Sequence, residues 1–180
     1  MPLEQEVKLA CDSVEAARRA VLNAGGRLAI PRRLLDDRLF DAFGSPLRLA
    51  HSSLRVRGDG DHGFITFKGP IHPGPVKIRE EIETRVASPA VARSIVEALG
   101  FHQWFRAEKY REEYELESAH IAIDETPIGT FIEIEGTPGL IEDITKRLGF
   151  TPADYQLESY QRLYSEWCQD HGRAPGDMTF

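Results

Sequence analysis

Apolar and charged positions alternate with a period of two in many segments of this chain. The first such segment, residues 2–10, places Glu4, Glu6 and Lys8 at alternate positions, with mostly apolar side chains between them. Side chains alternate between the two faces of a β-strand, so the three charged groups share one face. The segment is therefore predicted to be a strand whose charged face carries its chemistry.

The same alternation predicts a series of strands and helices along the chain. Further strands are expected in the ranges 27–41, 54–58, 64–69, 76–87, 101–116, 119–124 and 129–136. Helices are expected in the ranges 13–24, 88–99, 137–148 and 157–170, because most follow a Ser or Thr cap and end near Gly. Residues 42–53 and 70–75 read as connections, and residues 171–180 as a loose tail. Antiparallel strands joined by hairpins or single helices indicate a sandwich or a closed barrel.

Charged residues recur two positions apart on nearly every predicted strand. One row of charges on a strand usually faces water. Adjacent glutamates on one face repel each other by a few tenths of a kcal/mol, and such pairs on three strands indicate a compensating cation. The members of this set beyond the first strand are Arg55, Arg57, Thr66, Lys68, Lys77, Arg79, Glu81, Glu83, Lys109, Arg111, Asp124, Glu133 and Glu135.

Enclosed together inside a barrel, these groups would need partners of opposite charge. Hard cations such as Mg²⁺ or Mn²⁺ prefer carboxylate oxygens, and Mg²⁺ commonly links protein carboxylates to substrate phosphates. Arginine and lysine donate to phosphate oxygens. A divalent cation and a chain of phosphates would satisfy both sets of charges at once.

The composition of the chain excludes several classes of protein and of binding partner. At 180 residues the chain is expected to form one domain, and its net charge of −7 argues against general nucleic-acid binding. No apolar run reaches the roughly 18 residues of a membrane span, and no secretory signal opens the chain. Cys11 and Cys168 stand alone, which predicts a reducing cytoplasm and no zinc or disulfide framework. The six histidines are scattered and are expected at the surface.

The ordered charges resemble the signature of the CYTH superfamily, the triphosphate tunnel metalloenzymes. The resemblance starts at Glu4-x-Glu6-x-Lys8 and covers about residues 2 to 165. It continues through Arg55-x-Arg57, Lys68, Arg79-x-Glu81-x-Glu83, Lys109-x-Arg111, Asp124 and Glu133-x-Glu135. It implies an α+β fold, an eight-stranded antiparallel β-barrel forming a tunnel with flanking helices, as a single domain over residues 1–170.

The resemblance also implies roles for the charged residues. Mg²⁺ or Mn²⁺ would be held by Glu4, Glu6, Glu133 and Glu135, with help from Glu81, Glu83 and Asp124. The triphosphate would be bound by Lys8, Arg55, Arg57, Lys68, Arg79, Lys109 and Arg111. The catalytic set is expected to be Glu4, Glu6, Lys8 and Glu81, with the water-positioning carboxylate among the three glutamates.

Three activities are compatible with this site. The first is metal-dependent hydrolysis of inorganic tripolyphosphate, thiamine triphosphate or a nucleoside triphosphate. The second is a class IV adenylate cyclase, although such cyclases usually carry a His-Phe pair before the first glutamate, where this chain has only Met1-Pro2-Leu3. The third is a binding module without turnover. The expected partner is a small-molecule triphosphate, without membrane or nucleic acid, and a homodimer is compatible with the sequence.

Overall fold

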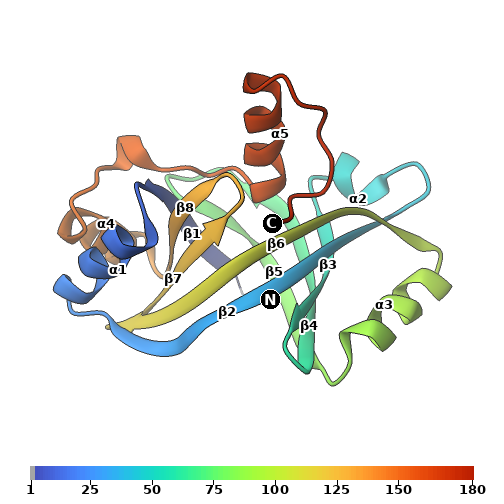
Figure 1. The fold of residues 1–180 in the computed structure, drawn as a ribbon, viewed down its shortest axis with the longest axis horizontal. Helices are drawn as coiled ribbons and strands as arrows, with labels where there is room; N and C mark the ends of the chain where they lie inside the picture. The colour runs from blue at the N-terminus through green and yellow to red at the C-terminus, as the bar shows by residue number, and fades with distance from the viewer. Residues whose placement is uncertain (1–2) are drawn as a thin grey trace.

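A computed structural model describes residues 3–180 as a closed eight-stranded barrel with helices packed around it (Figure 1). The strands are β1 (Leu3–Cys11), β2 (Arg27–Ala42), β3 (Ser53–Asp59), β4 (His62–His72), β5 (Lys77–Val86), β6 (Phe101–Leu116), β7 (Ala119–Thr126) and β8 (Gly129–Glu135). The helices are α1 (Val14–Asn23), α2 (Pro46–Leu49), α3 (Pro89–Ala98), α4 (Pro138–Arg147), α5 (Tyr160–Asp170) and a 3₁₀ turn, η1 (Pro152–Asp154).

The barrel closes in the order β1-β5-β4-β3-β2-β6-β7-β8, and every pairing is antiparallel. β8 then pairs with β1 again, where Lys8 lies opposite Glu133. The prediction of an eight-stranded antiparallel barrel with flanking helices is confirmed.

The alternation along the strands separates an apolar outer face from a charged inner one. Val7 and Leu9 on β1 pack outward into a core shared with Val21 of α1 and Ile144 of α4. A smaller core forms under α3, and the two cores lie on opposite sides of the barrel (Figure 1). These two cores therefore lie between the barrel and its helices, and most of the barrel interior is left for charged groups.

Two connections contain more regular structure than the sequence predicts. The segment between β2 and β3 holds the short helix α2, which starts at Pro46. The carboxylate of Asp41 accepts hydrogen bonds from the backbone N–H groups of Leu47 and Arg48 in the first turn of α2. β4 continues through Pro70 to His72, with a register shift at the proline. Residue 2, predicted to start the first strand, lies outside the described residues.

The C-terminal segment is docked on the barrel, so the prediction of a loose tail is wrong at its end. Met178 is 1% exposed, its N–H donates to the Arg106 carbonyl at 2.9 Å, and its carbonyl accepts from the Glu108 N–H at 2.8 Å. Within residues 3–180, β7 pairs with β6 only from Tyr110 onward, so no described strand pairs with that edge of β6 before this point. Backbone groups at a strand edge need partners, and the tail supplies them.

Met178→Ala is expected to lower the free energy of unfolding by about 2–5 kcal/mol, because it removes a fully buried side chain without refilling its space. Urea unfolding followed by circular dichroism measures the change. Phe180→Ala is the matched control, because the Phe180 side chain is 58% exposed and its loss should cost less. Equal midpoints for wild type and Met178→Ala would contradict the docking of the tail.

None of the helices within residues 3–180 is long and apolar enough to cross a membrane.

Candidate active site

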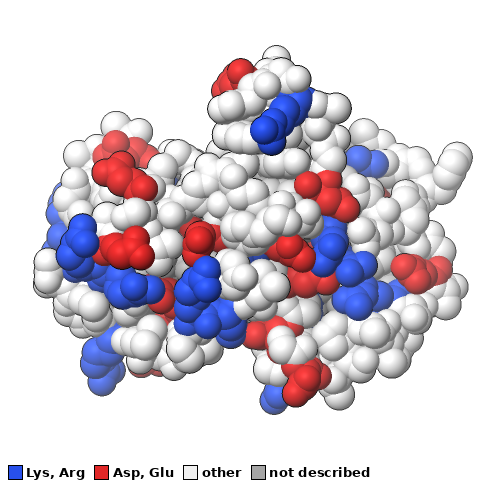
Figure 2. Space-filling view, in the orientation of Figure 1, with Lys and Arg blue, Asp and Glu red and all other residues white. Residues whose placement is uncertain are grey.

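The barrel encloses a cavity of about 860 Å³ that is lined mainly by charged side chains. Every predicted site residue lines this cavity except Asp124. The N-terminus of α5 reaches the cavity with Ser159, Tyr160 and Gln161. On the outer surface, positive and negative side chains are interspersed across the face shown in Figure 2. The dense array of charge predicted from the sequence is therefore inside the barrel.

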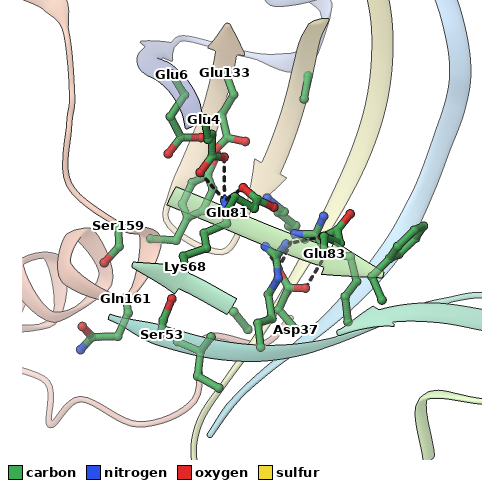
Figure 3. Close-up of a pocket in the computed structure, with 18 of the residues that line it drawn as sticks. Glu4, Glu6, Asp37, Ser53, Lys68, Glu81, Glu83, Glu133, Ser159 and Gln161 are labelled. Atoms are coloured by element: carbon green, nitrogen blue, oxygen red, sulfur yellow. Dashed lines mark hydrogen bonds and ion pairs between the residues drawn. The ribbon is translucent and has the colours of Figure 1, made fainter. Parts of the chain in front are cut away.

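Three carboxylates from two neighbouring strands gather at one part of the wall. Glu4 and Glu6 of β1 and Glu133 of β8 point into the same region (Figure 3). The Lys68 Nζ lies 2.6 and 2.8 Å from the two Glu4 oxygens, and the Lys77 Nζ lies 2.8 Å from Glu6 Oε1. Ammonium groups thus neutralise a cluster of acids that would otherwise repel one another.

Burial and mutual repulsion perturb the titration of these carboxylates. Burial, followed by the charge of Glu6, raises the pKa of Glu4 to about 7. Burial by itself raises the pKa of Glu6, but the charges of Lys8 and Lys77 hold that pKa well below its usual value. Burial and the nearby Lys8 ammonium also lower the pKa of Lys77 to about 8. The protonation state of each carboxylate in this wall therefore depends on the charges of the neighbouring carboxylates and lysines.

The chemistry of this wall fits a divalent cation. Glu4, Glu6 and Glu133 offer hard carboxylate oxygens, which Mg²⁺ and Mn²⁺ prefer. Within residues 3–180 no three His, Cys, Asp or Glu side chains are arranged to hold a metal ion as they stand, because their oxygens are turned to lysines and arginines. The carboxylate ligands therefore suit a divalent cation, but Glu4, Glu6 and Glu133 would have to leave their lysine partners to bind it.

Two further predicted metal ligands lie on β5. Glu81 accepts from Lys68 at 2.8 Å, which connects it to the Glu4 cluster. Glu83 accepts instead from the Thr66 hydroxyl at 2.6 Å and from Arg55 at 3.4 Å. β5 thus contributes to two separate groups of ion pairs.

Asp124 is fully buried beneath side chains that line the cavity. Its carboxylate accepts from Lys109 Nζ at 2.8 Å, from Arg111 Nε at 2.7 Å and from the Tyr160 hydroxyl at 2.8 Å. Arg111 also donates to Glu133. Asp124 therefore orients two side chains that are predicted to bind phosphate. Its predicted role as a metal ligand remains a prediction.

Asp37 of β2 is a site residue that the sequence reasoning missed. Its carboxylate accepts from Arg57 Nε at 2.6 Å and Nη2 at 2.8 Å, a two-pronged contact that fixes the guanidinium plane. The Arg55 Nη1 lies 3.8 Å away. Asp37 shares its strand face with apolar Leu35 and Leu39, so the sequence has no charged residue two positions before or after it. Only the pairing of β2 with β3, which places Asp37 opposite Arg57, identifies Asp37 as a site residue.

A second missed group includes a histidine expected at the surface. His120 lines the cavity, and its Nε2 lies 2.7 Å from Glu113 Oε2. Arg33 also pairs with Glu113, and its Nε lies 3.0 Å from Asp59. Burial raises the pKa of Glu113, but the hydrogen bonds from His120 and Arg33 lower it to about 2. This ion-pair network continues the charged lining along the tunnel.

Comparison with known proteins agrees with this architecture. Residues 2–147 match the model of the CYTH domain. The chain belongs to the CYTH domain family. A CYTH relative from Methanocaldococcus jannaschii, named "Putative adenylate cyclase", is 29% identical over 81% of each chain.

Solved structures share the CYTH fold. A protein from Pyrococcus horikoshii is 26% identical, with a TM-score of 0.74 over 87% of this chain and 96% of that one. A protein from Hippeastrum is 18% identical, with a TM-score of 0.63 over 96% of this chain and 97% of that one. The Hippeastrum protein is named for an adenylyl cyclase and described as having a dominant triphosphatase activity. Its likeness to this chain shows the fold alone.

Proposed function

We propose that this CYTH protein is a divalent-metal-dependent triphosphatase that binds its substrate inside the tunnel. The observation that supports this proposal most is that all seven cationic side chains predicted to bind phosphate line one cavity, beside a carboxylate cluster. The cationic side chains are Lys8, Arg55, Arg57, Lys68, Arg79, Lys109 and Arg111, from five strands of the barrel. Such a concentration of charge suits a chain of phosphates better than a single phosphate.

In the proposed reaction, water attacks the terminal phosphorus and the bond from that phosphorus to its bridging oxygen breaks. The arginines and lysines would orient the phosphates and neutralise charge on the oxygens. A carboxylate among Glu4, Glu6 and Glu81 would position the water and accept its proton. Mg²⁺ or Mn²⁺ held by Glu4, Glu6 and Glu133, with Glu135 near them, would supply further charge neutralisation. No cysteine or serine nucleophile is required.

The direct test is an assay of the purified protein with Mg²⁺ or Mn²⁺ against tripolyphosphate, thiamine triphosphate and ATP. Release of orthophosphate, lost on addition of EDTA, is the expected result. Binding of a triphosphate without turnover of any of the three would favour the binding module. A cytoplasmic site of action, in keeping with the unpaired Cys11 and Cys168, is part of the same proposal.

A second activity is favoured by the name of the Methanocaldococcus relative. In that reaction the ribose 3′-hydroxyl would attack the α-phosphorus of ATP, with loss of pyrophosphate. The same assay separates the two activities, because a cyclase releases pyrophosphate and cyclic AMP. Those products would overturn the triphosphatase proposal and leave the tunnel as the binding site.

A further inference from the structure

One end of the tunnel carries a stacked pair of planar side chains that the phosphate site does not use. The guanidinium carbon of Arg48, in α2, lies 4.4 Å from the ring centre of Trp104, in β6. Both residues line the cavity. Arginine and tryptophan are side chains on which aromatic ligands stack.

A local irregularity of β6 places the tryptophan at this position. Leu39 of β2 lies opposite Phe105 and the next residue, Phe40, lies opposite Gln103, so Trp104 is an extra residue without a partner on β2. Such a bulge redirects a side chain that regular alternation would aim elsewhere. Trp104 consequently lines the cavity together with its neighbour Phe105.

The arginine is held over the tryptophan by a buried acid. Asp41 is fully buried and accepts from the Arg48 backbone N–H at 3.1 Å and from its Nε at 3.3 Å. The Arg48 side chain is still 44% exposed, so one side of the guanidinium can be reached by a ligand. The pair is thus a fixed platform open to the tunnel.

The platform lies at a distance from the cations of β6 that are predicted to bind phosphate. A strand rises about 3.4 Å per residue, which puts the Cα of Trp104 roughly 17 Å along β6 from that of Lys109. The inward positions between them, at Phe105 and Ala107, are uncharged, and Met178 packs on them. On the neighbouring strands Arg55 lies opposite Leu39, which in turn lies opposite Phe105, so a phosphate chain that runs from Lys109 toward Arg55 would bring the group attached to it to the platform.

We propose that Arg48 and Trp104 form a stacking platform for a planar aromatic group, so that the site prefers nucleoside triphosphates to inorganic tripolyphosphate. The inference rests on the proposed triphosphatase function for its substrate and adds the class of group attached to the phosphates. Stacking of one base on such a surface changes affinity by about 10- to 100-fold.

Arg48→Lys tests the platform, because lysine keeps the positive charge and loses the plane. The ratio of kcat/KM for ATP to kcat/KM for tripolyphosphate is expected to fall about 10-fold or more. Arg38→Lys is the matched control: Arg38 faces away from the cavity and its Nη1 bonds Gln103 at 3.2 Å, beside the bulge. An unchanged ratio in Arg48→Lys, or an equal loss for both substrates, would overturn the inference.

A binding measurement separates this inference from the proposed hydrolysis. The chain contains two tryptophans, so Trp167→Phe leaves Trp104 as the single indole. In that variant, ATP is expected to quench the fluorescence in the presence of EDTA, and tripolyphosphate is not. Quenching by ATP in a protein that hydrolyses no triphosphate would refute the triphosphatase and support the platform. Equal responses to the two ligands, or none to ATP, would refute the platform.

Discussion

Replacing Asp124 with alanine is expected to lower the free energy of unfolding by about 3–5 kcal/mol. The fully buried carboxylate accepts hydrogen bonds from Lys109, Arg111 and Tyr160, and its removal leaves two positive charges inside the protein with too few partners. The loss of a buried partner is costly because water cannot replace it. Urea unfolding at neutral pH measures the difference in unfolding free energy.

Glu125→Ala is the matched control, because it removes a carboxylate from the adjacent residue of the same strand. Glu125 pairs with Arg32 at 2.6 Å on the outside, and its side chain is 38% exposed. Exposed ion pairs contribute about 0–1 kcal/mol, so this variant should stay close to wild type. Similar losses for Asp124→Ala and Glu125→Ala would show that the buried network does not stabilise the fold.

Glu4→Gln is expected to reduce triphosphate hydrolysis by roughly 100-fold or more, because loss of even an outer-shell partner of a metal ligand costs about 10- to 100-fold. The substitution keeps the shape of the side chain and removes the negative charge that a divalent cation would need. Lys68 retains Glu81 as a partner at 2.8 Å, so the fold should survive. The measurement is orthophosphate release over a range of Mg²⁺ and Mn²⁺ concentrations, with the melting temperature recorded alongside.

Glu80→Gln makes the same chemical change on β5, at a position that does not line the cavity. Glu80 lies opposite Leu3 in the register of β1 and β5, one residue from the Glu4–Arg79 pair. The triphosphatase activity of the Glu80→Gln variant should match that of the wild type. Full activity in Glu4→Gln would remove Glu4 from the proposed metal and catalytic sets.

The inner face of the barrel could be predicted from the sequence because strand periodicity is a property of the backbone. Glu4, Glu6 and Lys8 had to share a face wherever the strand was placed. The partners of those charges could not be predicted, because they depend on which strands are neighbours and on their register. Arg57 meets Asp37 only through the alignment of β2 with β3, and the register shifts in β2 obscure the alternation there.

The docking of the C-terminal tail could not be predicted from the sequence for a different reason. Met178 and Phe180 are the large apolar residues of the segment 171–180, and two such residues are too few to establish a periodicity. Its burial follows from the unpaired edge of β6, a tertiary feature. Trp104 is similar, because a bulge depends on the partner strand rather than on the residue itself.

The pairing of β1 has a consequence for biosynthesis. Its two neighbours are β5 and β8, and neither adjoins it in the sequence. As the ribosome makes the chain, β1 is synthesised before the other strands of the barrel, and both of its edges stay unpaired until β5 and β8 have been made. An open strand is an aggregation hazard that charged side chains reduce. Glu4, Glu6 and Lys8 would then protect the nascent chain from aggregation before the barrel closes around them.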